Sequence, residues 1–137
     1  MGADAARPGD RLANPAGEAA SLNTIAALHL DRHEFAQAAE RLKPALALCD
    51  RHGLVATRGN VLTNLTGVAM ALGDEAAAED HAQRALEHAR AAGNRSLVAF
   101  LGLLLVPLAL RRGDLPGARA ALRESLQTSR ALGKRGL

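Results

Sequence analysis

The sequence predicts an all-α protein built from three tandem helix-turn-helix units. Hydrophobic residues make up 48% of the 137 positions, and most of them are alanine and leucine, the strongest helix formers. Glycines also recur at a fixed interval, which indicates repeats. Aromatic residues make up only 1%, which argues against aromatic stacking platforms for single-stranded nucleic acid and aromatic cages for quaternary ammonium ligands.

Glycine spacing defines a repeat of 40 residues. Gly53, Gly93 and Gly133 lie 40 residues apart, and the segments before them align without a gap: PALALCDRHG, RALEHARAAG and ESLQTSRALG. A second turn lies 20 residues before each glycine, at His33-Glu34, Gly73-Asp74 and Gly113-Asp114. We therefore predict one domain, 14–133, with repeats 14–53, 54–93 and 94–133. A flexible N-terminal head, 1–13, precedes it and a tail, 134–137, follows it.

Residues at the repeat boundaries show where each helix begins and ends. Asn14 before Pro15 is typical of a helix N-cap followed by proline in the first turn. Gly73 ends the first helix of the second unit, and the side chain of Asp74 caps the next one. The same pattern recurs later in the chain, at Gly93-Asn94 and at Gly113-Asp114. Because the turns are so short, neighbouring helices must pack antiparallel.

Charge and hydropathy limit the partners. The formal net charge is +3, but the basic residues are spread along the chain rather than gathered into a phosphate-binding stripe. The longest apolar run, 97–110, is shorter than the roughly 20 residues that a membrane-spanning helix needs. The N-terminus lacks the apolar stretch of a signal peptide. We therefore predict a cytoplasmic protein that binds neither nucleic acid directly nor a membrane.

Residues that could carry chemistry form no convincing site. His29 and His33 lie four apart, but no third ligand follows at a metal-binding spacing. Cys49 and His52 share a helix end without an orienting acid, so they make no nucleophile pair. Glycine-rich phosphate loops and paired catalytic carboxylates do not stand out. The sequence predicts no enzyme, no catalytic residues, no metal and no cofactor.

The three units resemble the tetratricopeptide repeat (TPR) family, whose pattern is a Gly-Asp turn followed by alanines and a leucine. The first unit matches less fully, with His33-Glu34 at the turn and Ala38 and Leu42 in register, and the other two match well. The matching positions are Gly73-Asp74…Ala78…Ala82…Ala85-Leu86 and Gly113-Asp114…Ala118…Leu122…Ser125-Leu126. The usual TPR repeat has about 34 residues. This longer form is similar to the repeat region of large bacterial transcription activators of the MalT-like class. The resemblance implies a right-handed α-α superhelix that binds peptides or proteins in a groove lined by the first helices.

The family register implies which side chains line that groove. They are Asn23, Thr24, Asn60, Thr63, Asn64, Phe100, Leu103, Leu104 and Arg111. The groove would change from amide-rich to apolar along its length, which suits a peptide with one apolar anchor. The same asparagines and threonines equally fit the solvent-exposed face of two amphipathic helices.

The first helix of the third unit, SLVAFLGLLLVPLAL, has a single polar residue, Ser96. A helix that is apolar all round should be buried all round, yet a three-unit stack covers only part of it. We therefore predict a homo-oligomer, most simply a dimer, that associates through Phe100, Leu101, Leu104, Leu105 and Leu108. Alternatively, the third unit packs more deeply.

The sequence thus predicts a non-enzymatic scaffold that binds a protein or peptide and self-associates. One alternative is a regulatory or sensor module, or a fragment, of a bacterial transcription activator. Another is a carrier of an apolar small molecule.

Overall fold

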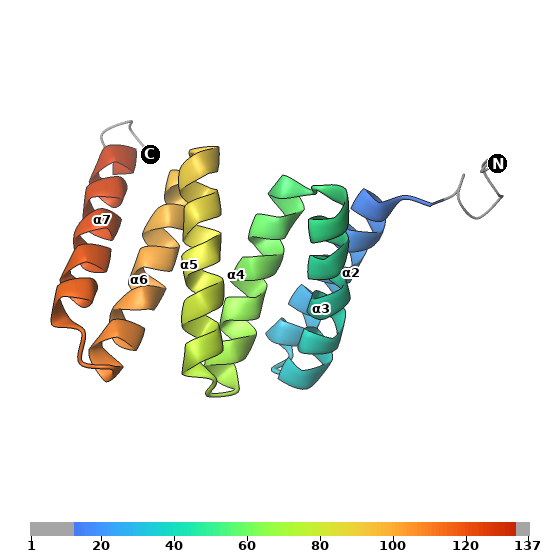
Figure 1. Ribbon diagram of the computed structural model, residues 1–137, viewed down its shortest axis with the longest axis horizontal. Helices are drawn as coiled ribbons and strands as arrows, with labels where there is room; N and C mark the ends of the chain where they lie inside the picture. The colour runs from blue at the N-terminus through green and yellow to red at the C-terminus, as the bar shows by residue number, and fades with distance from the viewer. Residues whose placement is uncertain (1–12, 134–137) are drawn as a thin grey trace.

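The described part of the chain, residues 13–133 of the computed structural model, forms six α-helices and no strand. They are α2 (Pro15–Asp31), α3 (Phe35–His52), α4 (Val55–Ala71), α5 (Glu75–Ala92), α6 (Arg95–Arg111) and α7 (Leu115–Gly133). The all-α prediction is confirmed, and each predicted unit contributes one helical hairpin (Figure 1). Apart from residue 13, the predicted head and tail lie outside the described residues.

Helix ends follow the predicted capping residues. In four helices the cap oxygen accepts a hydrogen bond from the backbone N–H three residues on: Asn14 from Gly17 at 3.0 Å, Asp74 from Ala77 at 3.1 Å, Asn94 from Leu97 at 3.1 Å and Asp114 from Gly117 at 2.8 Å. Gly73 and Gly113 turn the chain with φ of 79° and 77°, a region that favours glycine. His33 occupies the same turn in the first unit with φ of 59°.

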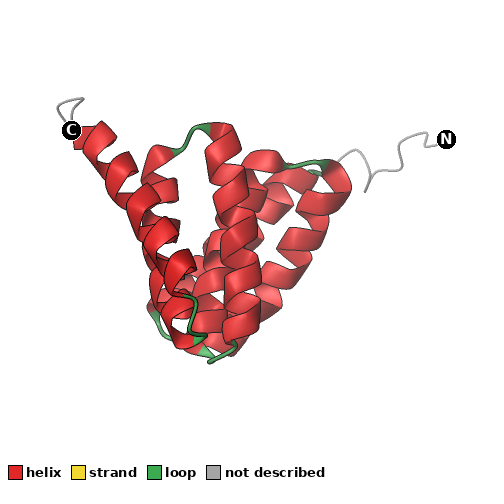
Figure 2. Ribbon diagram, turned by 60° about the vertical axis from the view of Figure 1, so that its left-hand side comes forward, coloured by secondary structure: helices red, strands yellow, loops and turns green. Residues whose placement is uncertain are grey.

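The helices form two layers, with the first helix of each hairpin in one layer and the second helix in the other (Figure 1). Short loops join them at the two ends of the bundle (Figure 2). Within the first layer, α2 also contacts α4 directly. We call the outer side of α2, α4 and α6, away from α3, α5 and α7, the first-helix face.

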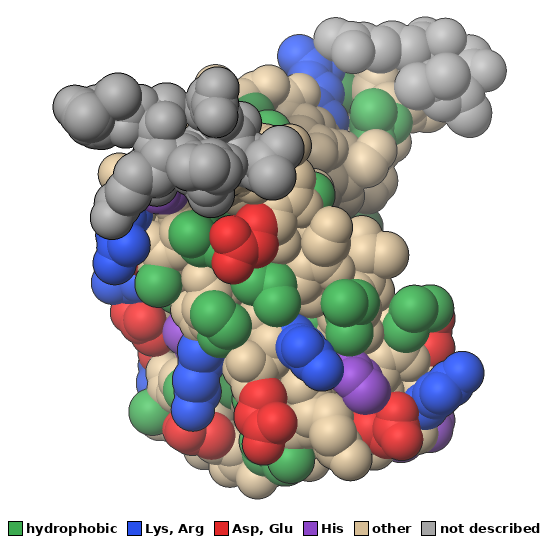
Figure 3. Space-filling model, turned by 90° about the vertical axis from the view of Figure 1, so that its right-hand side faces the viewer, with side chains coloured by type: hydrophobic (Ala, Val, Ile, Leu, Met, Phe, Trp, Pro, Cys, Tyr) green, Lys and Arg blue, Asp and Glu red, His purple; other side chains and the backbone are tan. Residues whose placement is uncertain are grey.

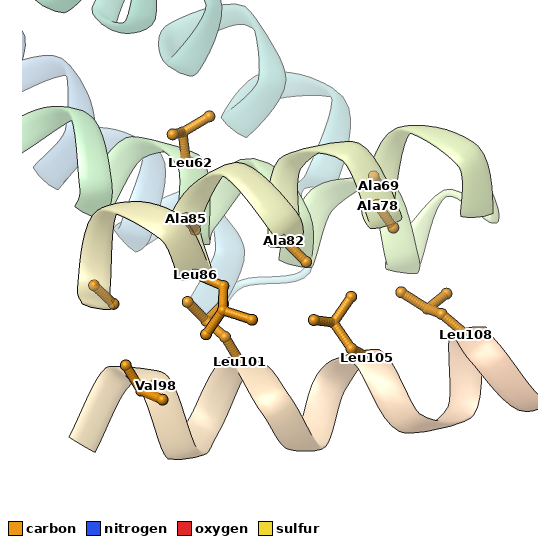
Figure 4. Close-up of a cluster of buried hydrophobic side chains, with 11 residues drawn as sticks. Leu62, Ala69, Ala78, Ala82, Ala85, Leu86, Val98, Leu101, Leu105 and Leu108 are labelled. Atoms are coloured by element: carbon orange, nitrogen blue, oxygen red, sulfur yellow. The ribbon is translucent and has the colours of Figure 1, made fainter. Parts of the chain in front are cut away.

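Two apolar clusters hold the hairpins together. One joins α2, α3 and α4 around Leu42 and Val61, and the other joins α4, α5 and α6. Figure 4 shows the second cluster, in which leucines along one side of α6 face small side chains of α5. Alanines Ala82 and Ala85 are fully buried there, so the two helices can approach closely. Each of the first two hairpins is therefore covered by the first helix of the next.

This packing corrects the predicted self-association surface. Leu101, Leu105 and Leu108 are only 0%, 5% and 4% exposed, because they are the α6 leucines that pack on α5. They belong to the core of one chain and are not available to a second copy. Of the predicted set, only Phe100, half exposed, and Leu104, partly exposed, reach the surface.

Within residues 13–133, no helix combines the length and the apolar character needed to cross a membrane.

Candidate binding site on the first helices

The exposed side of α6 carries an apolar stripe. Its members are Phe100, Leu103, Leu104, Pro107 and Leu110. Phe100, Leu103 and Leu110 are 50%, 53% and 51% exposed, and the other two are partly exposed. The spacing of three and four residues places all five on one side of the helix. Sequence reasoning missed Leu110 as a site residue, although the same spacing marks it.

The polar half of the predicted groove centres on an amide pair. The side-chain NH2 of Asn64 on α4 donates to the side-chain amide oxygen (Oδ1) of Asn23 on α2 at 2.9 Å. This bond leaves the NH2 of Asn23 and the carbonyl of Asn64 for a bound peptide backbone. The hydroxyls of Thr24 and Thr63 donate to carbonyls of their own helices, those of Ala20 and Gly59, at 2.9 Å. Asn23 and Asn64 are thus the polar groups best placed to bind a peptide.

Two predicted groove residues are engaged elsewhere. The guanidinium of Arg111 donates to the Glu75 carboxylate of α5 at 2.7 Å, so its charge is already paired. Asn60 lines a hollow of about 380 Å³ with His88 and Leu97, between α4, α5 and the start of α6. The structure therefore keeps the nine predicted residues at the surface, but it concentrates the usable groups in the amide pair and the apolar stripe.

A second hollow, of about 260 Å³, lies between α5 and α7. Leu86 and Leu105 line it, beside an ion pair in which Arg90 donates to both Glu124 oxygens at 2.8 and 2.5 Å. The hydrogen bond from Arg90 lowers the pKa of Glu124 and raises that of Arg90. Because these charges are paired with each other, the hollow offers few free groups to a ligand.

The remaining reactive side chains are isolated. Burial is the main cause that raises the pKa of the Cys49 thiol, so it remains protonated and is a poor nucleophile. Burial likewise lowers the pKa of His81, whose Nδ1 has no hydrogen-bond partner among the described residues. His29 bonds Glu34 at 2.9 Å, and the His33 ring lies edge-on to Phe35. Among the described residues, no three His, Cys, Asp or Glu side chains gather as metal ligands.

No protein-family model matches the chain, and no curated protein is significantly similar to it. The resemblance to the TPR family therefore stays a prediction from the sequence pattern, beside which the structure shows tandem helical hairpins.

Proposed function

We propose that the protein is a non-enzymatic cytoplasmic scaffold of the TPR-like class that binds a protein or peptide on its first-helix face. The observation that carries this proposal is the apolar stripe on α6, three of whose five side chains are at least half exposed. Exposed apolar patches of this kind mark contact sites. Covering the stripe at about 25 cal/mol per Å² would supply several kcal/mol of binding free energy.

The partner that fits this face has one apolar anchor and a nearby stretch of open backbone. The anchor would pack on Phe100 and Leu104, and the backbone would bond the amides of Asn23 and Asn64. Such a ligand is an extended segment or a helix with one apolar side.

Gly67 supports close approach to this face. It lies exposed in the middle of α4, where glycine costs about 1 kcal/mol relative to alanine. A Cβ added there would meet no atom within 4 Å, so packing inside the chain does not require glycine. A partner that lies against α4 gives a reason for the missing side chain.

The two alternatives have less support. A small-molecule carrier encloses most of its ligand. The apolar stripe instead stands half exposed along one helix. A regulatory module of a transcription activator would use the same face, but that role rests on the resemblance alone. A stand-alone scaffold requires only the observed face.

The test uses a random-peptide phage library panned against the full chain. We expect enriched peptides to share an apolar anchor and to lose at least about tenfold in affinity for Phe100→Ser, measured by calorimetry. Leu115→Ser is the matched control, because Leu115 is 56% exposed on a different helix, α7. Circular dichroism checks that both variants fold. Enriched peptides that bind Phe100→Ser as tightly as the parent would contradict the proposal.

A further inference from the structure

Both ends of the helical stack present apolar side chains. At the C-terminal end, Leu122 and Leu126 of α7 are 41% and 45% exposed. At the N-terminal end, Ile25 and Leu28 of α2 are 37% and 56% exposed. Figure 3 views this second end, where hydrophobic side chains lie together between acidic and basic ones. The repeat register shows what each end is shaped to contact.

The leucines of α7 occupy positions that a following helix covers elsewhere. Leu122 corresponds to Leu42 and Ala82, 40 residues apart in the earlier repeats, and both are fully buried. Leu126 corresponds to Leu86, which is 3% exposed. In those repeats α4 packs on α3 and α6 packs on α5. Within the described residues no helix packs on the outer side of α7, so this end lacks a first helix.

Helix α2 presents the complementary surface. Ile25 corresponds to Leu65 and Leu105, which are 7% and 5% exposed, and these pack toward the preceding hairpin. Leu28 corresponds likewise to Val68 and Leu108, both 4% exposed. Helix α2 therefore displays the side that first helices use to cover a second helix. This side has no such helix to cover within residues 13–133.

We propose that a second copy of this chain supplies the missing contact: α2 of one copy packs on α7 of the next, as α4 packs on α3. The charges of the two helices agree with this pairing. Helix α2 carries Glu18 and Asp31 and no lysine or arginine. Helix α7 carries three arginines, Arg119, Arg123 and Arg130, and one acidic residue, Glu124, which already bonds Arg90.

One interior ion pair predicts a specific contact at the new junction. Arg58 of α4 donates to the Asp50 carboxylate of α3 at 2.8 Å. The same register places Glu18 of one copy beside Arg130 of the next. Here the acidic residue is on the first helix and the arginine on the second, the reverse of the interior pair, and the two charges still attract each other.

A second interior pair predicts where the junction is weaker. Arg112, the residue directly after α6, pairs with Glu79 of α5. The same register brings Arg32 near Arg119, which are like charges, although Asp31 lies beside Arg32. This mixture favours a reversible association that strengthens with concentration over a permanent one.

Association of this kind joins two different surfaces, so it does not close at a dimer. The first-helix face takes no part in it and stays open. Head-to-tail pairing therefore goes beyond the proposed binding function, and it replaces the closed contact through α6 that the sequence predicted.

The test measures the mass of the full chain by light scattering on a sizing column over about a hundredfold range of concentration. We expect the mass to rise from the 14.2 kDa monomer past the dimer without a plateau. Ile25→Glu and Leu126→Glu each block one end, so each alone should stay monomeric. Mixed together they should form a heterodimer and nothing larger, because each variant keeps one intact end.

Charge and surface controls complete the test. Arg130→Glu should weaken association at least about threefold at low salt, and adding Glu18→Arg should restore it. Phe100→Ser should associate like the parent, which separates this proposal from the peptide-binding one. A monomer at every concentration, a mass that stops at the dimer, or end variants that stay monomeric when mixed would each overturn head-to-tail pairing.

Discussion

Helices α4 and α6 occupy the same place in successive repeats, but their outer sides differ. Both have 17 residues, and the register positions that both bury include three large apolar ones: Val61, Leu65 and Val68 in α4, Leu101, Leu105 and Leu108 in α6. On the outer side, α4 carries Asn64 and Gly67 where α6 carries Leu104 and Pro107. The shared stripe maintains the fold, so the side chains that differ are free to serve binding.

The two helices also meet their own second helices differently. Leu62 of α4 is fully buried, whereas α6 has Gly102 at the corresponding position. A Cβ on Gly102 would lie 3.1 Å from the Cβ of Ser125 and 3.2 Å from the Ala121 carbonyl. The Ser125 hydroxyl donates to the Ala99 carbonyl at 2.7 Å. A close approach and a hydrogen bond thus replace a leucine in fixing α7 on α6.

The largest expected effect is a difference in stability between variants on the buried side and on the exposed side of α6. Leu101→Ala should lower the free energy of unfolding by about 3 kcal/mol, because it removes a fully buried side chain and leaves a cavity. Leu103→Ala, two residues along and 53% exposed, should change it by less than about 0.5 kcal/mol. Urea unfolding measures both. If the two variants lost the same free energy of unfolding, Leu101 would not be more buried than Leu103, and the orientation of α6 would be wrong.

Sequence reasoning predicted the turns but not the orientation of α6. The caps at Asp74 and Asn94 follow from local hydrogen bonding, which a few adjacent residues determine. In a helix that is apolar on every side, the sequence pattern does not show which side is buried. The sequence of α6 alone therefore does not distinguish Leu101 from Phe100. The 40-residue register does distinguish them, because Leu101 corresponds to the buried Val61. The bond between Asn23 and Asn64 joins separate repeats and depends on how closely α2 approaches α4.

A smaller effect tests whether the outer side of α4 is shaped for binding. Gly67→Ala should raise the free energy of unfolding by about 0.5–1 kcal/mol, because alanine favours the helix and the new Cβ meets open space. The matched control is Gly102→Ala, where the Cβ would crowd Ser125, so no gain is expected. Urea midpoints compare the two. A Gly67→Ala variant no more stable than its parent would remove the argument that this glycine serves binding.

The smallest expected effect concerns the ion pair that links α5 to α7 over α6. Arg90 and Glu124 pair with each other. The residues 40 positions earlier, Asp50 and Arg84, do not pair with each other, because Asp50 pairs with Arg58 and Arg84 pairs with Asp80. Because Glu124 has its pKa lowered in the folded chain, the pair stabilises the fold above the unfolded carboxyl pKa of about 4.3. This contribution is lost as the pH falls through the lowered folded value.

Solvent limits the size of that contribution. The Arg90 and Glu124 side chains are 50% and 31% exposed, so Glu124→Gln should cost less than about 1 kcal/mol at neutral pH. Urea unfolding of the parent and the variant should show this gap at about pH 7, and the gap should shrink as the pH falls below about 4.3 and through the lowered folded pKa of Glu124. Glu40→Gln, at an exposed position of α3, is the control and should show no comparable gap. A gap that does not change with pH would mean that Glu124 stabilises the fold through packing. The charge of the Arg90–Glu124 pair would then not distinguish the third repeat from the second.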